Sequence, residues 1–351
     1  MLREQSEART QRAAWREFHF FECSHQRKQI RNKELDNNMK QPLKAIALAL
    51  GLTLAANSYA IEVKPVDTDF TLQILGSGGP ISDDLRASSG EIIWWKGKSR
   101  IMIDAGGGVY LRFGQAGAKL EDLDFMGITH FHTDHVNDVP ALLKGGYFFE
   151  REKALEISGP AAGSAFPSLN GYFAANFDPD HGAYAYLAGL YDGTDGLFPV
   201  NLTDVDYKST VPTVVYEKDG LKITALGIPH GDVPCLAYRI ESEEGVMVIS
   251  ADQNGSNPAF LGFARGADIL MLPMAIHEQA DGVSTFMHAK PSVIGEIAKE
   301  INPKMLVLNH WMGLGLKLKS ESVKIVREYY DGPVMSGRDL ASFPMSAVKE
   351  K

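Results

Sequence analysis

Four side chains that can bind a metal ion crowd into six positions of the stretch "ITHFHTDHVNDVPALL", residues 128–143: His130, His132, Asp134 and His135. The whole chain of 351 residues has only ten histidines. Imidazole nitrogen and carboxylate oxygen are ordinary ligands of zinc. In an extended segment, residues two apart face the same way, so His130 and His132 can reach one ion. Asp134 and His135 follow where the chain turns towards a helix, so the spacing favours two adjacent ions over one.

Three more candidate ligands each end an apolar run later in the chain. His230 ends "KITALGIPH", Asp252 ends "GVMVISAD" and His310 ends "KMLVLNH". A lone histidine or aspartate at such a position is more often a turn residue than a ligand. Together with the first group, these residues supply the six or seven protein ligands that two ions need. We therefore expect all of them at one rim of a sheet system.

The apolar runs that carry these residues predict strands, and the amphipathic segments between them predict helices. Strands that alternate with helices favour an α/β layered fold. The predicted strands lie in 70–80, 90–108 (two strands), 123–130, 153–160, 220–230, 235–242, 245–252 and, as the last strand, 304–311. The predicted helices are 136–146, an excursion within 161–200, 290–301 and, as the last helix, 322–330.

The motif "HFHTDH" matches the H-x-H-x-D-H signature of the metallo-β-lactamase superfamily, which the chain therefore resembles. The closer likeness is to the ribonuclease Z-like branch, and it rests on "ILGSGGP", "ISGP", "IPHGDVPCLAYRI" and "MHAKPSVIGEIAKE", in that order. Within this branch the chain is most similar to secreted bacterial arylsulfatases and class II cyclic-nucleotide phosphodiesterases. The resemblance implies a four-layer αββα metallo-β-lactamase sandwich over residues 61–351.

The resemblance also implies two divalent metal ions. These are zinc by preference, with manganese or iron left open for one site. The ligands that it implies are His130, His132 and His230 for one ion, Asp134, His135 and His310 for the other, and Asp252 as the bridge between them.

Two residues are candidates for a catalytic role beyond holding metal. Asp134 is expected to orient a hydroxide that bridges the ions. His288 matches the non-ligand histidine of the branch and is the candidate proton donor, with His277 as a rival.

Several neighbouring residues receive a structural interpretation. Arg86, Ser88 and Ser89 lie near the first glycine turn and are expected to support it. His181 is expected in a loop. Trp94 and Trp95 are adjacent in a predicted strand. Adjacent residues of a strand point to opposite faces, so one of the two is expected to be exposed or at an interface.

The predicted activity is hydrolysis of a small anionic ester, either a phosphodiester or an aryl sulfate, by a metal-bridging hydroxide. A lactonase or β-lactamase-type carbonyl hydrolase is the first alternative, because the same site suits it. A tRNA 3′-processing ribonuclease is a further alternative. A non-enzymatic metal-binding protein is disfavoured, since a structural zinc needs only four closed ligands.

The distribution of charge and the pattern of residues 39–60 predict the partners and the location of the protein. Residues 1–60 carry a formal charge of +4 and the rest −13, so the acidic body disfavours a nucleic-acid partner. The segment 39–60 has the charged start, apolar stretch and small-x-small end of a secretory signal peptide. Residues 1–38 are then interpreted as a disordered upstream extension that is not native. The signal peptide therefore predicts a periplasmic or secreted hydrolase that has no membrane span after cleavage. The resemblance also allows a homodimer.

Overall fold

The computed structural model describes residues 69–149, 151–163 and 165–349. The predicted signal peptide over 39–60 and the predicted extension over 1–38 lie outside these residues. Among the described helices, none combines the length and apolar character needed to cross a membrane.

The described strands form two sheets of seven, and each sheet has antiparallel strands on one side and parallel strands on the other. In spatial order the first sheet contains β14 (Ser342–Pro344), β1 (Phe70–Gly76), β2 (Gly90–Trp95), β3 (Lys98–Ile103), β4 (Phe125–Gly127), β5 (Leu155–Pro160) and β6 (Val200–Val205). In the same way the second contains β13 (Val334–Ser336), β12 (Met305–Asn309), β11 (Ile269–Pro273), β10 (Gly245–Ile249), β9 (Val233–Ser242), β8 (Leu221–His230) and β7 (Thr213–Lys218).

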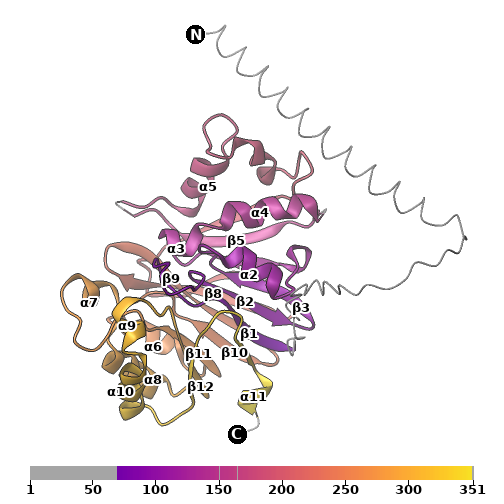
Figure 1. Cartoon of the computed structure of the whole chain (residues 1–351). Helices are drawn as coiled ribbons and strands as arrows, with labels where there is room; N and C mark the ends of the chain where they lie inside the picture. Colours follow the sequence, from indigo (N-terminus) through magenta and orange to yellow (C-terminus); the bar gives the residue numbers. More distant parts are fainter. Residues whose placement is uncertain (1–68, 150, 164, 350–351) are drawn as a thin grey trace, which may run out of the picture. The chain divides into compact units, whose positions relative to one another are not determined.

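Helices cover the outer face of each sheet (Figure 1). The first sheet is covered by α2 (Val109–Gln115), α4 (Val139–Phe148), α5 (Leu169–Phe177) and the 3-10 helix η2 (Ala185–Tyr191). The second is covered by α6 (Pro258–Ala264), α8 (Pro291–Ile301) and α10 (Lys319–Tyr329). The short helices are η1 (Leu120–Asp122), α3 (Thr133–Val136), α7 (Val283–Met287), α9 (Gly313–Lys317) and α11 (Ser346–Lys349).

Three apolar layers hold this arrangement together. One lies between the first sheet and its helices, one between the two sheets, and one between the second sheet and its helices. Burying apolar surface in each layer is the main favourable contribution to folding. The expected four-layer αββα sandwich is therefore confirmed.

Local sequence explains where several helices begin and end. Pro258 and Pro291 stand in the first turns of α6 and α8, where a missing amide hydrogen costs nothing. Asn257 caps α6 by accepting a hydrogen bond from the amide of Ala259 at 2.9 Å. Asn302 ends α8 in the left-handed conformation, with φ of 50°.

Two sequence expectations are wrong. Trp94 and Trp95 are both buried, at 7% and 2% exposure. The sheet that carries β2 is covered on both faces, so opposite-facing neighbours both meet apolar layers. The strand at 304–311 and the helix at 322–330 are also not the last, because β13, β14 and α11 follow them. These elements are only three or four residues long, too short for a periodic pattern.

Candidate metal centre

The candidate ligands come from the ends of four strands that belong to both sheets. Asp134 and His135 lie on α3, the short helix after β4, and His230 is the last residue of β8. Asp252 follows β10, and His310 follows β12. Parallel and antiparallel strands thus end at one rim, and their side chains meet there.

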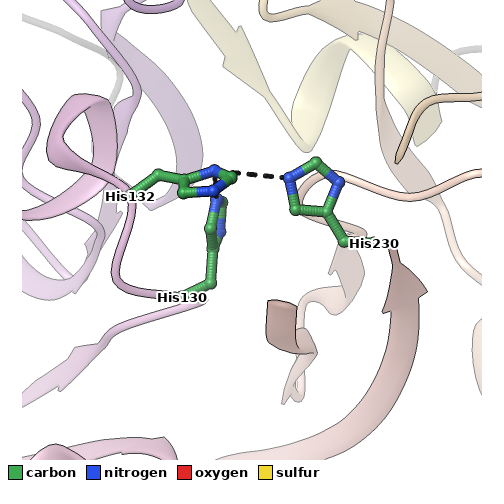
Figure 2. Close-up of side chains that lie close together, drawn as sticks. All are labelled: His130, His132 and His230. Carbon is green, nitrogen blue, oxygen red and sulfur yellow. Dashed lines mark hydrogen bonds between the residues drawn. The ribbon is translucent and has the colours of Figure 1, made fainter. Parts of the chain in front are cut away.

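The first group consists of His130, His132 and His230, whose donor atoms lie within 4.8 Å of one another. Figure 2 shows the three rings converging. His132 Nδ1 lies 3.0 Å from His130 Nε2 and 3.4 Å from His230 Nε2. Burial lowers the pKa of all three imidazoles. Neutral rings that aim nitrogen lone pairs at one point are a donor set for a cation, so the group fits a metal ion such as zinc.

The second group consists of Asp134, His135 and His310, again within 4.8 Å of one another. His310 Nε2 lies 3.3 Å from Asp134 Oδ2 and 3.3 Å from His135 Nε2. Burial would raise the pKa of Asp134, but the hydrogen bond from His310 and the charge of His135 lower it. One carboxylate and two imidazoles suit a second divalent ion.

Asp252 lies between the two groups. Its Oδ2 is 3.7 Å from His230 Nε2, 3.3 Å from His310 Nε2 and 3.6 Å from His135 Nε2. Burial alone would raise the pKa of this carboxyl, but the charges of His310 and His135 hold it well below its usual range. An ionised carboxylate that reaches both groups can contact two ions at once.

Hydrogen bonds behind the ligands fix which ring nitrogen faces the centre. His230 Nδ1 donates to the main-chain carbonyl of Met287 at 2.8 Å, so the free lone pair is on Nε2. His135 Nδ1 lies 2.7 Å from Asp104 Oδ2, which directs Nε2 of this ring inwards in the same way. Burial would lower the pKa of His135, but Asp104 raises it well above the ordinary range.

Asp104 is a supporting residue that the sequence interpretation missed. It follows β3, and it also accepts hydrogen bonds from the amide and hydroxyl of Thr129, at 2.7 and 2.6 Å. A signal for it was present, because "RIMID" is an apolar run that ends in an aspartate, as the run before Asp252 does. The carbonyl of Met287 carries no such signal, since any residue has one.

His288 lies beside the centre. Its Nδ1 is 4.0 Å from Asp252 Oδ2, and it forms a close group with His230 and Asp252. Burial lowers its pKa to about 4. His277, the rival candidate, is half-buried, and its Nδ1 accepts from the amide of Gln279 at 3.2 Å. Among the described residues, the close ligand groups do not include His277.

The remaining candidates lie around the centre or away from it. Ser88 Oγ donates to the carbonyl of Gly79 at 3.1 Å, and a methyl group on Gly79 would come within 2.9 Å of His310 Cε1. The hydrogen bond from Ser88 therefore supports the glycine turn at the point where the turn packs against His310. Arg86 donates to Ser77 Oγ at 2.6 Å. His181 is exposed in a loop, as expected.

Comparison with known proteins shows the family of the chain. Residues 99–311 match the family model described as the beta-lactamase superfamily domain. The ribonuclease Z of Mycobacterium sp. (strain KMS) is 26% identical over 250 residues, which cover 68% of this chain and 83% of that protein.

Solved structures share the fold. The short form of human tRNase Z superposes with a TM-score of 0.61 at 16% identity, covering 78% of this chain and 99% of that one. A diphosphatase of the PhnP family gives 0.57 at 16% identity, covering 78% and 97%. Because the family model matches residues 99–311, more than half of the chain, this chain belongs to the metallo-β-lactamase superfamily.

Proposed function

We propose that this protein is a binuclear metal-dependent hydrolase that cleaves a phosphodiester in a small anionic substrate. The observation that carries the proposal is Asp252, a buried carboxylate that lies within 3.7 Å of histidines from both ligand groups. A structural site for a single ion needs only four ligands, so it does not require a carboxylate shared between two ligand groups. In this assignment His130, His132 and His230 hold one ion, Asp134, His135 and His310 hold the other, and Asp252 bridges them.

Two bound divalent ions would supply an activated water and polarise the oxygen that gains charge. The chain's own residues would do the rest. Asp134 carries a depressed pKa, so it stays ionised and can accept a hydrogen bond from the attacking water. The ring nitrogens of His288 lie close to Asp252 and to His230 of the first group. Burial lowers its pKa to about 4, so the ring is neutral near pH 7 and we assign it the role of hydrogen-bond donor through its N–H group.

Two observations favour a small phosphorus ester as the substrate. The ribonuclease Z relatives and the PhnP-family diphosphatase are named for phosphoryl chemistry. The formal charge of −13 over residues 61–351 favours a small substrate over a long RNA, whose phosphates it would repel. A periplasmic or secreted location, from the predicted signal peptide, is part of the same proposal.

A substrate panel tests the proposal. Purified protein would be assayed with bis(p-nitrophenyl) phosphate, p-nitrophenyl sulfate, cyclic AMP, a precursor tRNA, a homoserine lactone and nitrocefin, each with and without chelator. We expect chelator-sensitive turnover of the phosphodiesters. Turnover of only the lactone and nitrocefin would favour a carbonyl hydrolase instead, and turnover of only the sulfate an arylsulfatase.

The location has its own test. Sequencing the N-terminus of the native protein should give a mature start near Ile61. A retained Met1 would contradict export through this signal.

A further inference from the structure

Two phenylalanine rings border the first ligand group. The ring of Phe166, half-buried, lies edge-on to the His132 ring with centroids 5.7 Å apart. The ring of Phe286 lies against Gly231, the residue after His230, because a methyl group on Gly231 would come within 3.0 Å of it. The His132 and His230 ring centroids are 5.2 Å apart, so one phenylalanine contacts a candidate ligand of the first group and the other lies against the residue next to a second ligand of that group.

Phe286 is held in place by its main chain while its side chain stays exposed. Its carbonyl accepts a hydrogen bond from Asn254 Nδ2 at 2.8 Å. The next carbonyl, of Met287, accepts from His230 Nδ1 at 2.8 Å. The Phe286 side chain is nevertheless 52% exposed, and none of the residues of α7 is buried. An isolated exposed phenylalanine needs no explanation, but this one directly precedes the residue whose carbonyl holds the candidate ligand His230.

We infer that Phe166 and Phe286 form a subsite for a planar aromatic group carried by the anionic ester. This inference rests on the proposed function, which places the ester's charged group at the neighbouring ions. Aromatic rings prefer edge-to-face or offset contact with other rings, and such pairs add affinity beyond the apolar area that they bury. The planar group is either a simple aryl ring or a nucleobase, since both offer the same flat apolar face.

Binding of paired ligands to the zinc-loaded protein, measured by calorimetry, tests the subsite without relying on turnover. Methylphosphonate and phenylphosphonate share the anionic head and differ in the ring. Ribose 5-phosphate and AMP differ likewise in the nucleobase. In the parent protein we expect the ring-bearing member of at least one pair to bind about fivefold more tightly, as expected for one favourable ring contact.

Variants decide whether these rings are responsible. Phe286→Ala and Phe166→Ala should each reduce that affinity ratio towards one, and Phe286→Tyr should preserve it. Phe149→Ala is the matched control, because Phe149 is 56% exposed but lies at the end of α4. A ratio lost in the phosphonate pair assigns the subsite to an aryl ring, and one lost in the nucleotide pair assigns it to a nucleobase.

One result would contradict the aromatic subsite alone, and a different result would contradict the proposed hydrolase site as well. If the ring-bearing ligands bind no better, or keep their advantage in both alanine variants, the subsite is wrong while the hydrolase proposal stands. If methylphosphonate and ribose 5-phosphate show no zinc-dependent binding at all, the proposed metal-ester site fails and the subsite fails with it.

Discussion

His135 Nε2 and His310 Nε2 face each other at 3.3 Å although 175 positions separate the two residues in the chain. Their rings are nearly parallel, with an interplanar angle of 17°. The end of β12 in the second sheet therefore meets α3, which follows β4 in the first sheet. The second candidate ion site exists only because the two sheets pack together, so its integrity depends on the layer between them.

The first prediction concerns the shared acid. Asp252→Ala should lower turnover of bis(p-nitrophenyl) phosphate by more than about 100-fold, the upper end of what loss of a residue that supports a metal site costs. Because Asp252 reaches both groups, the zinc content per chain should also fall, as measured by elemental analysis. Asp331→Ala, at an exposed aspartate, is the control. Full zinc content in Asp252→Ala would contradict a bridging role.

The second prediction concerns Asp104, which orients the His135 ring. Asp104 has φ of 57°, and asparagine tolerates this left-handed conformation, so Asp104→Asn preserves the backbone. Replacing a carboxylate oxygen that faces His135 Nδ1 should weaken zinc binding about 10- to 100-fold. A competition titration against a zinc-binding dye measures the change. An unaltered affinity would show that His135 does not need this support.

The third prediction concerns pH and Glu91, which is buried in β2 and accepts a hydrogen bond from Asn309 Nδ2 at 3.0 Å. Burial, and then the charge of Asp104, raises the pKa of Glu91 well above 4.5. The unfolded chain releases this proton near pH 4.5, whereas the folded chain keeps it, so the free energy of unfolding falls as pH rises between the two pKa values. Glu91→Gln keeps an acceptor for Asn309 and does not titrate.

The gain in unfolding free energy from Glu91→Gln should therefore be larger at about pH 8 than at about pH 5, by the linkage of protonation to folding. Urea unfolding of the chelated protein at both pH values measures it. Equal effects at the two pH values would mean that Glu91 titrates normally.

The fourth prediction concerns the contact between sheets. Tyr238 on β9 is fully buried, and its hydroxyl donates to the carbonyl of Ile128 at 3.0 Å and lies 3.0 Å from Ser158 Oγ. Tyr238→Phe should reduce the free energy of unfolding by about 1–3 kcal/mol, because these buried groups lose their partner. Tyr191→Phe, at a 43% exposed tyrosine, should have little effect in the same urea titration. If Tyr238→Phe and the parent have the same free energy of unfolding, the hydrogen bonds of the Tyr238 hydroxyl do not stabilise the contact between the sheets.

Much of the site could be predicted because its residues stand at the ends of apolar runs. His230 and His310 follow runs that read as buried strands, and these proved to be β8 and β12. The convergence of donor atoms agrees with the predicted ligands, whose binding of metal stays a prediction. The apolar run that ends at Asp104 could have marked it as a candidate. Its role could not be predicted, because its hydrogen bonds run to His135 and Thr129, which lie 31 and 25 positions away, and local spacing does not reveal such contacts.

The fold was harder to predict in detail where burial depends on both sheets. The tryptophan pair on β2 illustrates this, since neighbouring side chains on a strand are both buried when layers cover both faces. The edge strands β13 and β14 have three residues each, and tertiary pairing with β12 and β1 defines them more than their own sequence does.

The most direct test of the central claim is a zinc titration of the chelated protein, followed by the hydrolysis of bis(p-nitrophenyl) phosphate. If seven side chains hold two ions that act together, activity should be absent without metal and should reach its plateau at two zinc ions per chain. Activity that persists in chelator, or that is complete at one zinc ion per chain, would contradict the binuclear account.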